Sequence, residues 1–236
     1  MDLLDPFREA PEASALLFDV DGTLAPIAPR PELARLPAPT RAELERLAAT
    51  YRLVACISGR AGTEAAALVG VEGIRYVGNH GLELLPEAED LRTEIAAFRD
   101  SVGLEVEDKG LSLSYHYRGA ADEEEARRRL GQIEARAREA GLDPRWGRKV
   151  LEVRPAAQAD KGTAVETLLD GVPARLGLYA GDDTTDLDAF EGLGRAGLDV
   201  AVRIAVSSDE GPGALAEAAD LVVSSPAELA ALLAGL

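Results

Sequence analysis

The chain has 236 residues, a formal net charge of −17 and one cysteine. Its length can bury one large core, or a core together with a smaller domain. The negative charge argues against nucleic acid as a partner, since phosphate backbones are bound by dense lysine and arginine patches. The single cysteine, Cys56, excludes an intramolecular disulfide and favours a reducing compartment.

The start of the chain and its hydropathy favour a cytoplasmic location. The first residues, MDLLDPFREAP, contain acids and prolines where a signal peptide would have a basic region followed by an apolar one. No stretch approaches the roughly 20 apolar residues that a membrane helix requires. We therefore predict a soluble cytoplasmic monomer with no membrane partner.

The first third of the chain alternates short apolar runs with amphipathic stretches. Strands are expected at 15–18, 52–57 and 74–77, and helices at 40–49 and 62–69. Thr40 and Glu43 have the spacing of a capping box at the start of the first of these helices. This alternation is typical of a parallel sheet with right-handed crossovers.

A different pattern extends over 88–155. Strands are expected there at 104–106, 111–118 and 149–154, and helices at 91–102 and 122–140. The middle strand alternates strictly between apolar and polar residues, which is the period of a half-exposed antiparallel strand. We predict a small α+β insert with one polar sheet face, carried by a core formed from 1–87 and 156–236.

The buried α/β pattern returns after the insert. The expected elements are a helix from 160 to 169, a strand at 177–180, an acidic turn at 181–186, a helix through 190, a strand at 200–204, and a final strand and helix from 221. The predicted fold class is therefore α/β, with a Rossmann-like parallel-sheet core and an inserted α+β domain.

Polar residues follow several of the predicted core strands. Asp19 and Asp21 come after the first strand, two residues apart, so both point the same way while the chain is extended. Asp21-Gly22 is also a common turn dipeptide, which leaves a purely structural interpretation open. Ser58 follows the second strand. Ligands of open α/β sheets bind beyond the carboxyl ends of the strands, where these residues would lie.

Lys161 and the acidic turn strengthen the functional interpretation. A cation at a helix N-terminus opposes the helix dipole, so we expect an anionic group beside Lys161. Asp182, Asp183 and Asp186 lie within one turn. One capping residue would satisfy the following helix, whereas clustered carboxylates repel unless a cation neutralises them, and an all-oxygen set suits Mg²⁺.

These groups together suit phosphoryl transfer. A carboxylate can attack phosphorus and form an aspartyl-phosphate, which divides one difficult step into two easier ones. A sugar alkoxide is a poor leaving group, and a second acid can give it a proton and later take one from water. A magnesium ion screens the repulsion between carboxylate and phosphate, while a lysine and a hydroxyl hold the phosphate oxygens.

The order and spacing of these residues resemble the four motifs of haloacid dehalogenase (HAD) superfamily phosphatases. The matching segments are DVDGT at 19–23, Ser58, Lys161 and GDD at 181–183. The superfamily carries a cap domain between its second and third motifs, and the insert at 88–155 occupies that place.

The resemblance implies a role for each matched residue. Asp19 would be the nucleophile and Asp21 the general acid and base. Ser58 and Lys161 would bind the phosphate. Asp182 would be a magnesium ligand together with Asp19 and the backbone carbonyl of Asp21.

Two further acids, Asp183 and Asp186, would support the metal or its waters, and Asp183 is included among the expected metal ligands.

A narrower resemblance is to the trehalose-6-phosphate phosphatase family. It rests on the strings DVDGTLAPI, SGR, GNHG, EDKGLSLSYHYR, VLEVRP, ADKG and GDDTTDLDAF, which extend over nearly the whole chain. The chain departs from the family at Leu187, where glutamate is common. The resemblance implies an enzyme that converts trehalose 6-phosphate to trehalose and phosphate with Mg²⁺ as cofactor.

Polar residues of the insert are candidates for binding the sugar. The candidates are Lys109, His116, Arg118, Glu152 and Arg154. Arg60 would contact the substrate or only pair with an acid. For the insert residues, the structural alternative is a solvated sheet face with surface ion pairs worth little.

Other functions remain open at this stage. They are a phosphatase of another sugar phosphate or glycosyl-glycerate phosphate, a sugar phosphomutase, and a sugar-phosphate sensor without catalytic activity.

Overall fold

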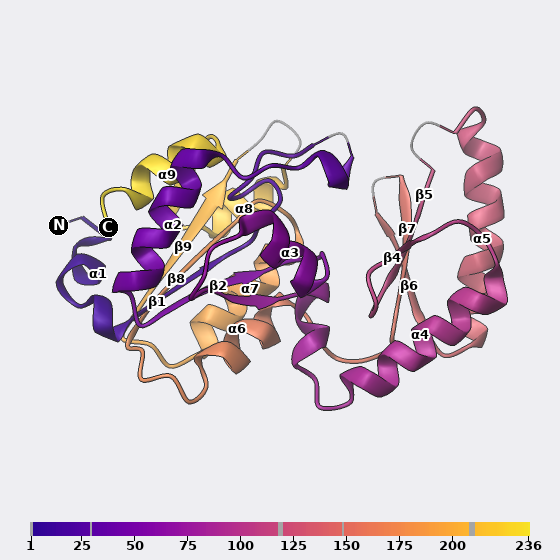
Figure 1. Ribbon diagram of the computed structural model, residues 1–236, viewed down its shortest axis with the longest axis horizontal. Coiled ribbons are helices and arrows are strands. Elements are labelled where there is room, and N and C mark those ends of the chain that lie inside the picture. Colours follow the sequence, from indigo (N-terminus) through magenta and orange to yellow (C-terminus); the bar gives the residue numbers. More distant parts are fainter. Residues whose placement is uncertain (1, 29, 118–119, 148, 208–210) are drawn as a thin grey trace. The chain divides into compact units, whose positions relative to one another are not determined.

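The computed structural model describes residues 2–28, 30–117, 120–147, 149–207 and 211–236. The chain divides into two compact units, one made of Met1–Gly81 with Ala159–Leu236 and the other of Leu82–Gln158 (Figure 1). Arg118, a candidate sugar contact, lies outside the described residues. No helix in the described part of the chain is both long enough and apolar enough to cross a membrane.

The first unit, the core, contains a six-stranded parallel sheet in the order β10-β9-β8-β1-β2-β3. Its strands are β1 Ser14–Phe18, β2 Leu53–Ile57, β3 Arg75–Val77, β8 Leu176–Gly181, β9 Val200–Val206 and β10 Leu221–Val223. Every residue of β1, β2 and β8 is buried. Burial on both faces explains why these strands have continuous apolar runs in place of an alternating pattern.

Helices cover both faces of this sheet, with α2 and α9 on one side and α6 and α7 on the other (Figure 1). The helices are α1 Asp5–Glu9, α2 Ala38–Thr50, α3 Gly62–Val69, α6 Lys161–Leu169, α7 Thr185–Arg195, α8 Gly213–Ala218 and α9 Pro226–Leu233, with short 3-10 turns at Pro11–Ala13, Pro31–Leu33 and Asn79–Leu84. The wholly buried central strands therefore lie between two helical layers, as in other doubly wound sheets.

The capping box predicted at Thr40 is wrong. Helix α2 begins at Ala38, with Pro37 as its N-cap, no capping side chain, and a proline in its first turn. A proline there has the helical φ already fixed and lacks an N–H that the first turn would leave unpaired, so the helix starts ahead of Thr40. A capping box is present instead on α6, where Asp160 accepts from Thr163 N at 2.7 Å and Thr163 Oγ1 accepts from Asp160 N at 3.0 Å.

The second unit, which we call the insert, contains a four-stranded antiparallel sheet in the order β4-β5-β7-β6. Its elements are α4 Ala88–Val102, β4 Glu107–Asp108, β5 Leu113–His116, α5 Glu123–Glu139, β6 Asp143–Gly147 and β7 Val150–Arg154. Apolar residues of both helices and of β5 and β7 form a separate hydrophobic cluster. The insert therefore has a core of its own.

The structure of the insert differs from the sequence-based expectations at three points. The strand expected at 104–106 lies at Glu107–Asp108, and β6 was not expected, because Pro144 and charged neighbours hide its pairing with β7. The polar face of the strand expected at 111–118 is not half exposed along its length either, since Ser112 and Ser114 are buried. Ser114 lies between Glu107 of β4 and Glu152 of β7 in the sheet register, and longer neighbours on both sides leave a serine little exposed surface.

Candidate active site

The sequence-predicted polar residues of the core meet at the carboxyl edge of its parallel sheet. Strand β1 pairs with β2 on one side and β8 on the other, so the residues that follow these strands, Asp19, Ser58 and Asp182, are brought to one place. The backbone N–H of Asp19 donates to the Ala180 carbonyl at 2.9 Å and continues the pairing with β8. This is the edge where ligands of open α/β sheets bind.

Lys161 is the first residue of α6, and the capping box at Asp160 and Thr163 determines where that helix begins. Its ammonium donates to Asp19 Oδ1 and to Asp186 Oδ1, both at 2.7 Å, and only 2% of its side chain is exposed. The expected anionic group beside Lys161 is therefore confirmed, and there are two of them. Burial opposes the charged form of Lys161, but Asp186 and Asp19 outweigh it and raise its pKa, so the group is an ammonium.

Asp186 is completely buried and holds the acidic loop together. Its Oδ1 accepts from Lys161 Nζ and from the Tyr179 hydroxyl at 2.7 Å, and its Oδ2 accepts from the backbone N–H groups of Asp182 and Asp183 at 2.9 Å. A buried carboxylate needs such donors because it has lost its water. Asp186 therefore ties α6, β8 and the loop after β8 to one another.

Asp182 lies against the segment that follows β1. Thr23 donates its hydroxyl to Asp182 Oδ1 at 3.0 Å. Gly22 has φ +92°, and a Cβ at that position would lie 2.0 Å from Asp182 Oδ2. Glycine is therefore required here for both its backbone conformation and its lack of a side chain, which explains the Asp21-Gly22-Thr23 string beyond a simple turn.

Three carboxylates form a group that could hold a metal ion. Among the described residues, Asp19, Asp182 and Asp186 each offer an oxygen within 4.8 Å of the others, and all three are buried. Burial raises the pKa of Asp19 well above its usual value, against the opposing effect of Lys161, and burial together with Asp186 raises the pKa of Asp182 to about 7. A hard cation with oxygen ligands, such as Mg²⁺, would relieve this cost, so the donor set fits it.

The side chains of the other two expected metal ligands, Asp183 and Asp21, have hydrogen-bond partners of their own. The Asp183 side chain is exposed and its Oδ1 accepts from Thr184 N at 2.6 Å, so this carboxylate caps the loop. The Asp21 carboxylate forms a bidentate ion pair with Arg60, with both N···O distances at 2.6 Å. The expected metal ligand of Asp21 is its backbone carbonyl, which this side-chain ion pair does not involve.

Arg60 joins the loops that follow β1 and β2. Besides Asp21, its guanidinium donates to the Pro31 carbonyl at 3.1 Å. Its backbone N–H donates to Ser58 Oγ at 3.1 Å, and Ser58 is buried. Of the two roles expected for Arg60, the structure shows pairing with an acid.

The insert brings some of the candidate sugar contacts together. Lys109 Nζ lies 3.8 Å from Glu152 Oε1, and both side chains are largely buried. Arg154 is two residues further along β7 and is also buried. His116 is different, since its Nε2 lies 2.6 Å from Glu107 Oε2 and about half of its side chain is exposed.

Tyr179 is a residue of the core site that the sequence reasoning missed. It belongs to β8 and is fully buried, and its ring packs edge-to-face on Phe190 with centroids 6.1 Å apart. A signal was available, because a tyrosine within a continuous apolar strand must find a hydrogen-bond partner for its hydroxyl.

The chain is similar to known proteins of one family. The trehalose-phosphatase family model matches residues 17–226. A trehalose-phosphate phosphatase of Mycobacterium marinum is 36% identical over 242 residues, which is 92% of this chain and 59% of the relative. The chain therefore spans about 59% of the length of that curated relative.

Solved structures share the fold. The trehalose-6-phosphate phosphatase C-terminal domain of C. albicans matches with a TM-score of 0.70 and 22% identity, over 99% of this chain and 96% of that one. A trehalose-6-phosphate phosphatase related protein matches with a TM-score of 0.68 and 24% identity, over 94% and 96%. The predicted α/β core with an antiparallel α+β insert is thus confirmed. The family model covers most of the chain, and the chain therefore belongs to the trehalose-phosphatase family.

Proposed function

We propose that this chain is a Mg²⁺-dependent phosphatase that hydrolyses trehalose 6-phosphate to trehalose and phosphate through an aspartyl-phosphate on Asp19. The observation that carries the proposal is the buried ammonium of Lys161 between the carboxylates of Asp19 and Asp186, with Asp182 beside them. The family membership, and the similarity to the trehalose-phosphate phosphatase of M. marinum, support the substrate.

Asp19, Asp182 and the backbone carbonyl of Asp21 would hold the magnesium ion. Asp186 is less suited to be a direct ligand, because its two oxygens already accept four hydrogen bonds. When bound, Mg²⁺ supplies positive charge that screens the repulsion between carboxylate and phosphate.

In the first chemical step, a carboxylate oxygen of Asp19 forms a bond to phosphorus and the bond from phosphorus to the sugar oxygen breaks. Lys161 holds the Asp19 carboxylate and stabilises the transferring phosphoryl charge, and Ser58 binds a phosphate oxygen. Asp21 gives its proton to the departing sugar oxygen. In the second step, a water molecule loses a proton to Asp21 and attacks phosphorus, and the bond between phosphorus and Asp19 breaks.

The ion pair between Asp21 and Arg60 must open, and Asp21 must take up a proton from solvent, before the first step. A carboxylate held by two guanidinium hydrogen bonds is in its ionised form and cannot donate a proton. The substrate phosphate offers Arg60 another anionic partner of the same geometry. We propose that Arg60 moves from Asp21 to the substrate, which combines the two roles expected for it.

The polar residues of the insert would select the sugar. Lys109, Glu152 and Arg154 can donate to or accept from sugar hydroxyls, and His116 would do so only after leaving Glu107. The cytoplasmic location is supported by the single, buried cysteine. The monomeric state and the absence of nucleic-acid binding remain predictions from the sequence.

A substrate panel tests the function. Phosphate release should be measured with trehalose 6-phosphate, glucose 6-phosphate, sucrose 6-phosphate and a glycosyl-glycerate phosphate, each with Mg²⁺ and with EDTA. We expect trehalose 6-phosphate to exceed the others by about tenfold or more in kcat/KM, with activity lost in EDTA. If the enzyme prefers another sugar phosphate, that compound takes the place of trehalose 6-phosphate as the proposed substrate. If none of the compounds releases phosphate, the alternative of a sugar-phosphate sensor without catalytic activity is favoured.

Magnesium should also stabilise the fold in a pH-dependent way. The pKa of Asp182 in the folded protein is about 7, above its ordinary 3.8, so the folded state binds this proton more tightly than the unfolded state. The metal-free protein should therefore lose stability as the pH rises from about 4 through about 7. Bound Mg²⁺ replaces the proton, so saturating Mg²⁺ should raise the melting temperature by about 5 °C or more at pH 8, and by less at pH 5.

Thermal melting with Mg²⁺ and with EDTA at the two pH values measures this effect. In the Asp182→Asn variant most of the shift should disappear. A Mg²⁺ shift that is equal at both pH values, or larger at pH 5, would contradict the assignment of these carboxylates to the metal.

A further inference from the structure

The hydroxyl of Tyr179 is a buried polar group that the mechanism above does not use. Tyr179 is fully buried in β8, and its hydroxyl donates to Asp186 Oδ1 at 2.7 Å. The same oxygen accepts from Lys161 Nζ, which also donates to Asp19 Oδ1 at 2.7 Å. Tyr179 is thus connected to the proposed nucleophile through two intervening side chains, Asp186 and Lys161, and the described residues show no direct hydrogen bond from Tyr179 to Asp19.

The hydroxyl remains a donor under all ordinary conditions. Burial, followed by the negative charge of Asp186, raises the pKa of Tyr179 well above its usual value. A phenol that stays protonated beside a carboxylate must direct its proton to the carboxylate oxygen. One acceptor position of Asp186 Oδ1 is therefore permanently occupied.

This occupation affects where Lys161 lies. The terminal torsion of an aspartate is soft, so its carboxylate orientation is determined by its hydrogen bonds. Two backbone N–H groups hold Oδ2, and Tyr179 and Lys161 share Oδ1. Without the phenol, Oδ1 would have its full acceptor capacity for Lys161 and would draw the ammonium away from Asp19.

We propose that Tyr179 is a positioning residue for phosphoryl transfer, which acts through Asp186 to keep the Lys161 ammonium directed at Asp19 and the transferring phosphoryl group. The inference rests on the proposed function, since it concerns the same reaction. A misplacement of a charged group by about 1 Å can cost up to about 10²-fold in rate.

The test is Tyr179→Phe, which keeps the ring and its edge-to-face contact with Phe190 and removes only the hydroxyl. We expect kcat to fall about 10- to 100-fold while KM for trehalose 6-phosphate changes less than about twofold, because the substrate does not touch Tyr179. Inhibition by orthovanadate, which mimics the five-coordinate transition state, should weaken by a similar factor to kcat.

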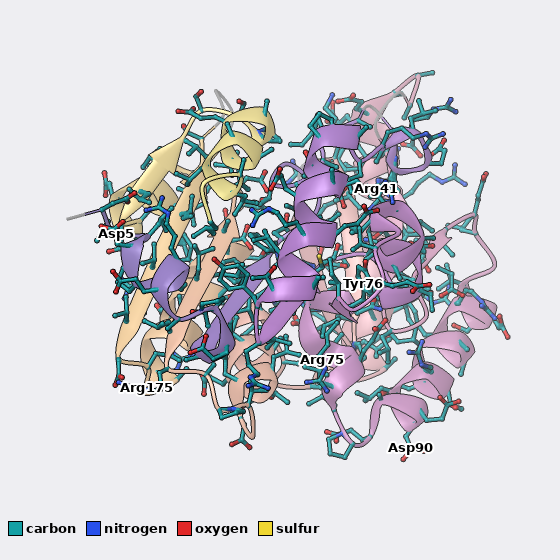
Figure 2. All side chains as sticks on the ribbon, turned by 60° about the vertical axis from the view of Figure 1, so that its left-hand side comes forward. Asp5, Arg41, Arg75, Tyr76, Asp90 and Arg175 are labelled. Atoms are coloured by element: carbon teal, nitrogen blue, oxygen red, sulfur yellow. The ribbon has the colours of Figure 1, made fainter. Side chains whose placement is uncertain are left out.

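Tyr76→Phe is the matched control. Tyr76, labelled in Figure 2, also donates its hydroxyl within the core, to the Val71 carbonyl at 2.8 Å. Within the described part of the chain, its hydroxyl has no hydrogen bond to a residue of the candidate active site. Both variants should be assayed below their melting temperatures. Tyr76→Phe should keep the wild-type kcat and vanadate inhibition, so a loss shared by both variants would show a merely structural role and overturn the inference.

A double-mutant cycle tests the route through Asp186. If Tyr179 acts through this carboxylate, Tyr179→Phe should have no further effect on kcat in the Asp186→Asn background. Two results would overturn the inference and leave the phosphatase function standing. One is a double variant whose loss in kcat equals the product of the two single-variant losses, and the other is a kcat for Tyr179→Phe within about twofold of wild type. If Asp186→Asn does not fold, the kcat and vanadate comparison with Tyr76→Phe decides. Wild-type protein without turnover on any substrate of the panel would instead overturn the proposed function, and the inference with it.

Discussion

Asp19→Asn is expected to keep the fold and to lose at least about three orders of magnitude in kcat. The amide oxygen can still accept from Lys161, and Lys161 keeps its second partner, Asp186. The amide cannot attack phosphorus as a carboxylate does, so the covalent intermediate is not formed. Removing a catalytic nucleophile typically has an effect of this size or larger.

The stability of the Asp19→Asn variant gives an independent check. Burial disfavours the ionised form of Asp19, and Asp186 and Asp182 add repulsion. A neutral amide at this position avoids that cost, so metal-free Asp19→Asn should unfold at the same urea concentration as wild type or a higher one. The added stabilisation by Mg²⁺ should be smaller than in wild type, because one ligand oxygen is less negative.

Asp170→Asn is the control for this experiment. Asp170 is an exposed carboxylate at the end of α6, and its replacement should leave turnover unchanged. Wild-type turnover by Asp19→Asn would reject the covalent mechanism. A variant that is inactive because it has unfolded would be recognised from its lost urea transition.

Lys161→Met is expected to have the largest effect on stability. Lys161 is the ammonium between Asp19 and Asp186, and its removal leaves two carboxylates buried without their counter-charge. Breaking a buried ion pair by removing one partner typically costs about 3–5 kcal/mol. Turnover should also be lost, because the transferring phosphoryl group would no longer meet a positive charge at this position.

Urea unfolding at pH 8 and pH 5 measures this effect. The destabilisation should be smaller at pH 5, because carboxyl groups that take up protons no longer need a counter-charge. Lys149→Met is the matched control, since Lys149 pairs with Glu123 and both side chains are more than 40% exposed. Exposed pairs are worth about 1 kcal/mol at most. Equal losses in the two variants would show that Lys161 is not a buried counter-charge.

Much of the core was predictable from the sequence because local chemistry specifies it. The apolar runs of β1, β2 and β8 predict strands buried on both faces, and the polar residues after them are then brought to one edge of the sheet by the parallel topology. The position of Lys161 at a helix start predicted an anionic neighbour, because an isolated cation there is unfavourable. Helix α3 was also predicted with its observed bounds.

The predictions of secondary structure failed at short segments whose sequence has no clear hydrophobic period or has competing capping signals. Strand β6 contains Pro144 and charged residues, so its composition does not predict a strand. It is a strand because it pairs with β7. The start of α2 was misplaced because Thr40 and Glu43 satisfied one local rule, while proline in the first turn satisfied a competing one.

The sequence alone determined which residues lie at the sheet edge, because it shows which polar residues directly follow the buried strands and how the motifs are spaced. Only the tertiary structure decided which atoms meet. In the structure Asp21 pairs with Arg60, and Asp183 is exposed. Both carboxylate oxygens of Asp186 accept hydrogen bonds, from Tyr179, from Lys161 and from backbone N–H groups of the loop after β8. The reason is that the contacts of Asp21 with Arg60 and of Asp186 with Lys161 join segments far apart along the chain. Their distances therefore depend on how the buried layers pack and not on any local preference.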